Sequence, residues 1–287
     1  MLQQLLNGVT LGLMYALVAL GYTLVFGVLR LLNFAHGEIF MLASVLAYLQ
    51  LTDLGWPVWV TLLVTSGTMG VVGIVLWATC FRPASREEDH MAPALSSFAF
   101  GLIITATVVK LMGMESRALP PNFNTAGFEL GPVSINGSQL WIFAVSIALM
   151  GGLIWFVRHT RPGRAMRAIS ENMRAAALMG VRKDRVIALT FFVSSALAGA
   201  AGVLILLRQG VTNPLIGLSI GIKAVAVMVI GGIGNFAGAV VVGLAVGIAE
   251  VMVVQYGQGA LADAIVWTGL AIILLVRPSG IFRGAKL

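Results

Sequence analysis

The sequence predicts an all-α polytopic membrane protein with about eight to nine transmembrane or half-spanning helices and a short cytoplasmic helix. Of its 287 residues 59% are hydrophobic and 10% are charged, whereas soluble proteins contain about 45–50% and about 25%. The 34 glycines favour close helix packing in lipid. This composition argues against a soluble enzyme or a disordered chain, and a single cysteine, Cys80, excludes an internal disulfide.

Nine apolar runs are candidates for membrane-spanning helices, which need about 20 apolar residues. They cover residues 5–29, 38–51, 58–81, 93–112, 139–157, 186–207, 216–232, 236–254 and 262–276. The runs 38–51 and 216–232 are short, so either could be a half-helix or a re-entrant segment, and eight full spans plus a broken one is an alternative. No stretch between the runs is long enough for a soluble domain, so residues 1–287 are predicted to form a single membrane domain.

Basic residues gather in segments that we expect on one side of the membrane. Eight of the 18 lie between Arg158 and Arg185, and Arg277, Arg283 and Lys286 follow the last run. Cytoplasmic loops collect Lys and Arg, so both segments are predicted to be cytoplasmic, and the four runs between them make the two assignments consistent.

Counting back from these two anchors orients the rest of the chain. It places 113–138 outside as an extracytoplasmic loop, 82–92 inside, 52–57 outside and 30–37 inside. No aromatic side chains interleave with the basic residues of 158–185, so nucleic acid is not expected as a partner, and acidic lipid headgroups are.

A short sequence repeat occurs at two breaks between apolar runs. NFAHG covers Asn33 to Gly37, and NFAG covers Asn235 to Gly238. Transporter folds often contain such repeats, with interrupted helices near the substrate path. Paired glycines four residues apart, such as Gly8/Gly12 and Gly243/Gly247, predict close helix contacts.

The motifs of an enzyme are missing from the sequence. There is no G-x-x-x-x-G-K-[ST] phosphate cradle, so the chain is not expected to hydrolyse ATP. His36, His90 and His159 lie in separate segments without metal-ligand spacing, so no metal site is expected. Neither a nucleophile elbow nor a pair of carboxylates stands out, so catalytic residues are not expected.

Charged and polar residues near or within the apolar runs are candidates for the transport pathway. Lys223 and Glu250 lie at similar depth in two successive antiparallel runs, which predicts an ion pair at the outer mouth of a pathway. Glu250 could instead extend to the interface. Asn33, His36 and Glu38 suit either a cytoplasmic turn that satisfies helix ends or irregular backbone that lines a cavity.

The segment 160–185 is the longest cytoplasmic loop and is predicted to contain a short helix that starts after Ser170. Ser170 would cap this helix, with Glu171 in its first turn. Ala175, Ala176 and Gly180 resemble the EAA-x-x-x-G coupling loop of ABC-importer permeases, in which a short helix binds a groove of the ATPase subunit. Arg174 stands where that motif has glutamate, and Arg182 lies in the basic flank.

Three longer blocks resemble the branched-chain amino-acid permease family of LivH type, as does the terminal RPSGIF. The blocks are NGVTLGLMYALVALGYTLVFGVLRLLNFAHGE, RAISENMRAAALMGVRKDRVIALTF and GIKAVAVMVIGGIGNFAGAVVVGLAVGIAE. The resemblance implies a bacterial inner-membrane permease subunit without a cofactor of its own. The implied partners are a homologous second permease subunit of LivM type, two ATP-binding cassette subunits that carry ATP-Mg, and a periplasmic substrate-binding protein.

The resemblance implies transport of branched-chain or other hydrophobic amino acids. Related subfamilies handle urea, short amides or small carboxylates, so these substrates are alternatives. A channel or carrier that works without ATP is the main rival from another class. It usually needs acidic residues at the membrane centre, whereas Glu38, Glu250 and Asp263 lie near the ends of the predicted runs.

Overall fold

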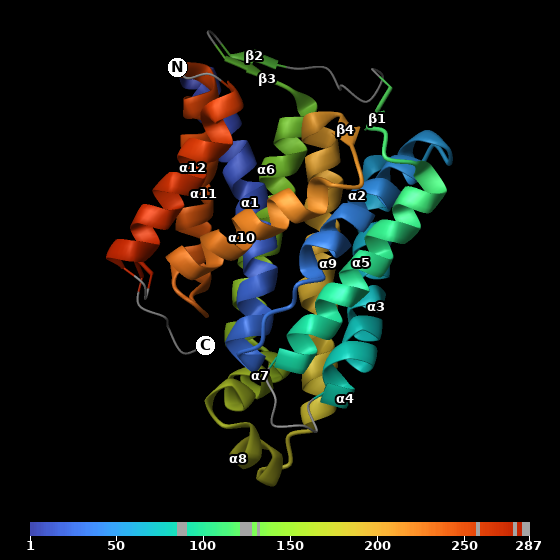
Figure 1. The fold of residues 1–287 in the computed structure, drawn as a ribbon, viewed down its shortest axis with the longest axis vertical. Helices are drawn as coiled ribbons and strands as arrows, with labels where there is room; N and C mark the ends of the chain where they lie inside the picture. Colours follow the sequence, from blue (N-terminus) through green and yellow to red (C-terminus); the bar gives the residue numbers. More distant parts are fainter. Residues whose placement is uncertain (85–90, 121–127, 131–132, 257–258, 278–279, 283–287) are drawn as a thin grey trace.

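The computed structural model describes residues 1–84, 91–120, 128–130, 133–256, 259–277 and 280–282. Long helices run between two ends of the molecule (Figure 1). The α-helices, short ones included, are α1 (Leu2–Leu29), α2 (His36–Thr52), α3 (Val58–Leu76), α4 (Arg82–Ala84), α5 (Met91–Met112), α6 (Gly137–His159), α7 (Arg161–Glu171), α8 (Met173–Leu178), α9 (Lys183–Gln209), α10 (Ile216–Gly231), α11 (Phe236–Tyr256) and α12 (Gly259–Val276). A π-helical turn, Trp77–Phe81, continues α3.

The nine predicted runs are confirmed as helices, with ends that differ by three residues or fewer. Within the described residues, six helices are long and apolar enough to cross a membrane: α1, α3 with its π-helical turn, α5, α6, α9 and α11. The two runs predicted to be short form α2 and α10, of 17 and 16 residues. The all-α membrane fold predicted from composition is therefore confirmed.

Short strands mark one end of the molecule and short helices the other. β1 (Arg117–Ala118) pairs antiparallel with β4 (Val211–Thr212), and β2 (Phe128–Leu130) pairs with β3 (Val133–Ile135). Both pairs lie at the end opposite α7 and α8 (Figure 1). This agrees with the prediction that 113–138 and 158–185 face opposite sides, although 121–127 and 131–132 lie outside the described residues, as do Arg283 and Lys286.

α1–α2–α3 and α9–α10–α11 form an inverted repeat. α1 and α9 run in opposite directions (Figure 1), and each ends at a residue in the left-handed region, Arg30 at φ 56° and Gly210 at φ 65°. A six-residue lead-in then precedes a short helix in both halves. Equivalent residues are 180 positions apart, and this offset also relates the start of α3 to that of α11 within two residues.

The two lead-ins share one hydrogen-bonded turn. The side chain of Asn33 accepts from the Ala35 N–H at 3.1 Å, and that of Asn213 accepts from the Leu215 N–H at 3.0 Å. The internal repeat is therefore present, but the counterpart of Asn33 is Asn213, and the predicted counterpart Asn235 is wrong. Asn235 instead begins α11, where its side chain accepts from the Gly238 N–H at 3.0 Å.

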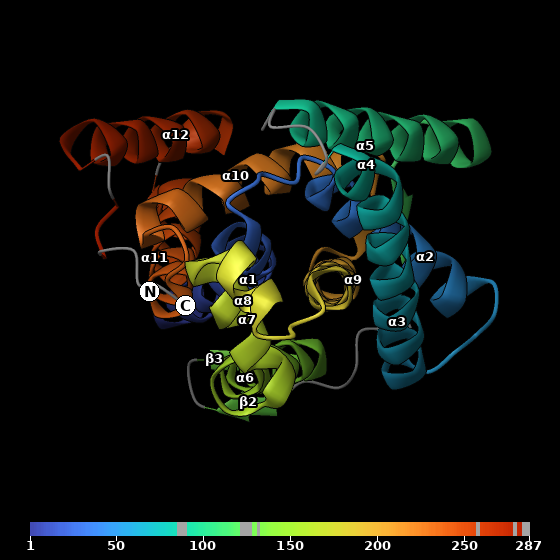
Figure 2. The ribbon, with the colours of Figure 1, turned by 90° about the horizontal axis from the view of Figure 1, so that it is seen from below.

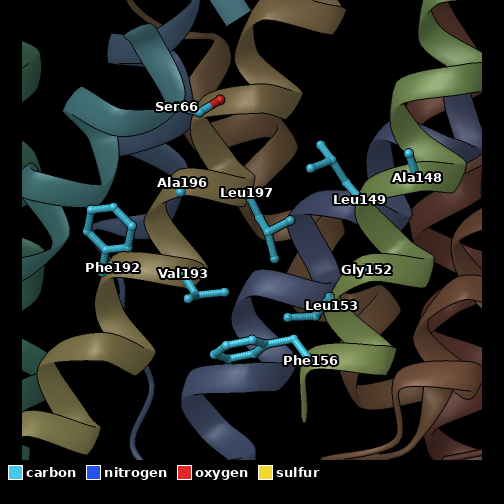
Figure 3. Close-up of a pocket in the computed structure, with 10 residues that line it drawn as sticks. All are labelled: Ser66, Ala148, Leu149, Gly152, Leu153, Phe156, Phe192, Val193, Ala196 and Leu197. Carbon is cyan, nitrogen blue, oxygen red and sulfur yellow. The ribbon is translucent and has the colours of Figure 1, made fainter. Parts of the chain in front are cut away.

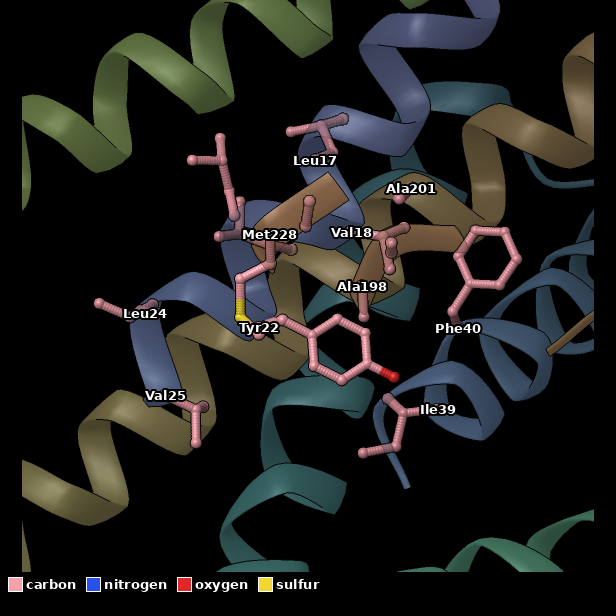
Figure 4. Close-up of a cluster of buried hydrophobic side chains, with 14 of the residues drawn as sticks. Leu17, Val18, Tyr22, Leu24, Val25, Ile39, Phe40, Ala198, Ala201 and Met228 are labelled. Carbon is pink, nitrogen blue, oxygen red and sulfur yellow. The ribbon is translucent and has the colours of Figure 1, made fainter. Parts of the chain in front are cut away.

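The core lies where the two halves meet. Seen along the helices, α1 and α9 lie side by side at the centre, and α2, α3, α6, α10 and α11 surround them (Figure 2). Figure 4 shows side chains from α1, α2, α9 and α10 packing together, among them Leu17, Phe40, Ala198 and Met228. Because these four helices share one cluster, movement of either short helix changes the packing around the central pair.

Glycines bring α1 and α11 into close contact. A methyl carbon added at Gly8 would lie 2.7 Å from the Cα of Ile248, and one at Gly12 would lie 2.6 Å from the Cα of Leu244. Neither position has room for a side chain, so the close contact predicted for the Gly8/Gly12 and Gly243/Gly247 pairs is confirmed.

Candidate functional site

The two short helices cross at their first turns. A methyl carbon at Gly37 of α2 would lie 2.5 Å from the Gly217 carbonyl oxygen, and one at Gly217 would lie 2.7 Å from the Gly37 carbonyl oxygen. Interrupted helices that meet inside a bundle are typical of transporter substrate sites, because their ends present backbone groups and dipoles to the path. This crossing is the centre of the candidate site.

Asn33 and His36 lie inside the bundle and not in a cytoplasmic turn. Both are buried, with exposed fractions of 2% and 0%. The His36 ring packs edge-on against Tyr22, with ring centroids 4.5 Å apart, and fills the space that Gly21 leaves open. Among the described residues, neither His36 ring nitrogen nor Asn33 Nδ2 makes a hydrogen bond. Of the two alternatives given for this segment, the cytoplasmic turn is wrong for Asn33 and His36, because the chain turns back into the core after Arg30.

Glu38 lies in the first turn of α2 and beside the first turn of α10. Thr105 of α5 donates a hydrogen bond to its Oε2 at 2.7 Å, and a methyl carbon at Gly217 would lie 2.8 Å from the same oxygen. Helix N-termini stabilise negative charge, so this carboxylate is held where two such ends meet. Glu38 is at a helix end as predicted, but that end is inside the bundle.

Lys223 and Glu250 form the predicted ion pair. Lys223 Nζ lies 3.0 Å from Glu250 Oε1, with side-chain exposed fractions of 5% and 16%. Tyr15 of α1 donates its hydroxyl to Glu250 Oε2 at 2.8 Å, and Lys223 Nζ lies 5.8 Å from the centre of the Tyr15 ring. The pair therefore joins α1, α10 and α11. Its role in transport stays a prediction.

The segment predicted as one short helix consists of two. α7 begins at Arg161, where Thr160 caps it by accepting from the Gly163 N–H at 3.1 Å, and Asn172 caps α8 by accepting from the Ala175 N–H at 3.0 Å. The predicted cap is wrong, because Ser170 lies inside α7 and its hydroxyl donates to the Arg167 carbonyl. Glu171 accordingly ends α7 and does not occupy a first turn.

The predicted coupling residues lie along α8 and the turn that follows it. Ala176 packs inward, whereas Arg174, Ala175 and Arg182 are exposed. Gly180 has φ 85°, and nothing lies within 4 Å of a methyl carbon built on it. A glycine at this position therefore permits the left-handed turn that leads into α9, and it is not required by a tight contact within this chain.

The prediction from sequence missed Leu178, the last residue of α8, and Met179, which follows it; they are 89% and 86% exposed. They lie at the end of the molecule beyond the apolar helices (Figure 1), so lipid tails do not account for their exposure. Two adjacent apolar residues in an otherwise basic loop were the available signal. Two adjacent exposed apolar side chains make this tip of the molecule a candidate for a contact with a protein or a membrane surface.

Two apolar pockets open on the sides of the bundle. One, of about 280 Å³, lies between α3, α6 and α9 and is walled by residues such as Leu149, Phe156 and Phe192 (Figure 3). The other, of about 490 Å³, lies between the end of α1, the lead-in to α2 and the start of α5, and Arg30 contributes to its wall. Arg30 was also absent from the residues predicted to be functional.

Comparison with known proteins gives the family. Residues 4–276 match the family model described as "Branched-chain amino acid transport system / permease component". The chain is 38% identical to the Escherichia coli K12 high-affinity branched-chain amino acid transport system permease protein LivH, over 98% of this chain and 94% of the relative. It is 35% identical to BraD of Pseudomonas aeruginosa over 98% and 95%, and 26% identical to a probable LivH of Methanocaldococcus jannaschii over 91% and 83%. The chain therefore belongs to the family of permease components of branched-chain amino acid transport systems.

Proposed function

We propose that this chain is the permease subunit of an ATP-driven importer for branched-chain or other hydrophobic amino acids. It would work in a bacterial inner membrane, with its C-terminus and α7–α8 in the cytoplasm. Its partners would be a homologous second permease subunit, two ATP-binding cassettes that hold ATP-Mg, and a periplasmic binding protein that delivers the substrate. The family and its transport-system relatives support the substrate class.

The apolar tip of α8 is the observation that carries the ATP-driven part of the proposal. Leu178 and Met179 are almost fully exposed between basic flanks, at the end away from the strands. A cassette groove would bury these side chains. α7 contacts α1 and α6, and α8 leads through a short turn into α9, so displacement of the tip would be passed to the central helix pair and to the crossing of α2 and α10.

Uptake into proteoliposomes tests the function directly. We expect uptake of radiolabelled leucine only when the chain is reconstituted with its second permease, its cassettes and its binding protein, and only with ATP. Strong uptake by the chain alone would establish the ATP-independent channel or carrier instead. Preferential uptake of urea or a short amide by the complete system would retain the importer and overturn the amino-acid assignment.

A substitution at the α8 tip tests the coupling. Leu178→Asp should lower ATP-driven uptake at least about tenfold, because loss of a central contact in an interface commonly costs about 2 kcal/mol or more. Leu54→Asp is the matched control, since Leu54 is also exposed but lies in the turn between α2 and α3. Equal uptake by Leu178→Asp and the unsubstituted chain would contradict docking through this tip.

A further inference from the structure

Among the described residues, the wall of the larger of these two pockets is apolar except for one charged residue, Arg30. Its volume of about 490 Å³ is in the range of about 300–1,000 Å³ found for small-molecule sites. The end of α1 and the start of α5, which line it, lie toward the end of the molecule that carries α7 and α8 (Figure 1). The wall consists of Phe26, Arg30, Leu31, Leu32, Phe34, Met91, Ala94, Leu95 and Phe98. We call this the Arg30 pocket.

The walls of the Arg30 pocket are held by specific contacts. Phe34 and Phe98 pack edge to face, with ring centroids 6.4 Å apart and planes at 86°. The Phe34 N–H donates to Ser97 Oγ of α5 at 3.1 Å, which ties the lead-in of α2 to the first turns of α5. These contacts fix two aromatic rings in the wall to which Arg30 also belongs.

Arg30 adopts a left-handed backbone conformation, which is unfavourable for a residue with a Cβ atom. Within the part of the chain that the structure describes, it is the one non-glycine residue with positive φ. Its repeat counterpart is Gly210, which has nearly the same conformation without the penalty of a Cβ atom. A residue held in a strained conformation points to a role for its side chain. Arg30 is one of the residues that line the pocket.

We propose that the Arg30 pocket binds an aliphatic α-amino acid on the release side of the pathway, an inference that rests on the proposed function. The guanidinium would bind the carboxylate, and the phenylalanine, leucine and methionine side chains would surround the aliphatic group. The ammonium would face the carboxyl end of α1, whose last carbonyls lack intrahelical partners and carry partial negative charge. A cation beside a negative helix end complements a zwitterion.

The pocket between α3, α6 and α9 shows why the Arg30 pocket is the one assigned. Among the described residues, ten line this wall; Ser66 is the only polar one, and none is charged (Figure 3). An apolar groove of that kind suits a lipid chain or another helix. In this part of the chain it offers no cation to pair with the carboxylate of an amino acid, whereas the Arg30 pocket does.

Protection of a cysteine in the pocket tests the proposal. Leu95→Cys in a Cys80→Ser background places a single thiol in the wall. With the full chain and its partners in nanodiscs, leucine should slow maleimide labelling of this thiol. The leucine concentration for half-protection should rise at least about tenfold in Arg30→Gly and in Arg30→Asn, because a charge-assisted hydrogen-bonded contact is lost. Arg30→Lys should fall between.

Two controls separate this site from general effects of charge or lipid. Arg158→Ala removes an exposed arginine from the last turn of α6, outside the pocket wall, and should leave protection unchanged. Nanodiscs with and without anionic lipid distinguish a headgroup from the substrate. Slower labelling with anionic lipid but not with leucine would overturn the proposal in favour of a lipid site.

The remaining outcomes are also decisive. Arg30→Gly relieves the strained backbone, so it should fold, and unchanged protection in this variant would show that Arg30 only ends the helix and would overturn the proposal. Absence of protection by leucine in a preparation that shows ATP-driven uptake would overturn the pocket assignment alone. Absence of uptake would instead count against the proposed function.

Discussion

The two halves of the inverted repeat share their backbone and differ in the chemistry of their side chains. The positions equivalent to Lys223 and Glu250 in α10 and α11 are Ala43 and Gly70 in α2 and α3. The buried ion pair therefore belongs to one half only. Helix lengths, lead-ins and turns repeat because backbone hydrogen bonds determine them, whereas burying a charge is costly and calls for a separate explanation.

The halves also differ in how each lead-in is anchored. The lead-in of α10 is part of a strand pair, with β4 on β1 and the Leu119 N–H donating to the Gly210 carbonyl at 2.7 Å. The lead-in of α2 is bound by Ser97 of α5 at the other end of the bundle. Each short helix is therefore tied to a different end of the molecule, an arrangement suited to opening the two ends in turn.

Removing Lys223, the cation of the ion pair that only one half contains, should cause the largest loss of stability and transport. Lys223→Met leaves Glu250 mostly buried without its ion-pair partner, and loss of one member of a buried pair costs about 3 kcal/mol or more of folding free energy. Thermal unfolding in a fixed detergent should therefore show a marked decrease in Tm. Leucine uptake by the reconstituted system should decrease with it.

The double variant sharpens this test. Lys223→Met with Glu250→Gln removes both charges, so most of the lost stability should return. If transport stays low while stability recovers, the pair has a role in the pathway; if both recover, the pair is structural. Single variants that leave folding and transport intact would remove the reason to assign the pair any function.

A second test uses equivalent glycines in the two halves. Gly247 of α11 packs against the backbone of Gly12, whereas nothing lies within 4 Å of a methyl carbon at its counterpart, Gly67 of α3. Gly247→Ala should decrease the free energy of unfolding by about 2 kcal/mol through overpacking. Gly67→Ala should be neutral or slightly stabilising, since alanine favours helix. Equal loss in both variants would contradict the packing difference between the halves.

The helices were predictable from the sequence because a helix that spans a bilayer needs about 20 consecutive apolar residues. Such a run can be recognised from the local sequence alone. All nine runs, including 38–51 and 216–232, form helices at the expected positions. The ion pair was also predictable, because Lys223 and Glu250 are exceptional in apolar runs and lie in antiparallel neighbours. Local composition was sufficient to predict the helices, and the similar depth of the two charged residues in neighbouring runs was sufficient to predict the ion pair.

The re-entry of Asn33 and His36 was not predictable by the same reasoning. A polar segment between two apolar runs usually faces water, and the choice between a turn and a re-entrant segment depends on tertiary contacts, such as that of His36 with Tyr22 and Gly21. The wrong helix start at Ser170 had a local cause. Thr160 followed by a proline in the first turn is the stronger start signal, and it begins α7 ten residues earlier.

The smallest expected effect concerns Ser195, the counterpart of Tyr15. Tyr15 hydrogen-bonds to the ion pair, whereas the Ser195 hydroxyl is buried and has no partner among the described residues. Ser195→Ala should therefore raise the free energy of unfolding by up to about 1 kcal/mol, because an unsatisfied polar group leaves the interior.

The neighbouring residue supplies the control for Ser195→Ala. Ser194 donates its hydroxyl to the Gly21 carbonyl at 2.9 Å and is equally buried, so Ser194→Ala should lower the free energy of unfolding by about 1 kcal/mol. Opposite signs at adjacent serines, measured by thermal unfolding in one detergent, would show that the position equivalent to Tyr15 keeps a buried hydroxyl that belongs to no polar network. A loss of stability in both variants would mean that the Ser195 hydroxyl makes a stabilising hydrogen bond, and would contradict the difference drawn between Ser195 and Tyr15.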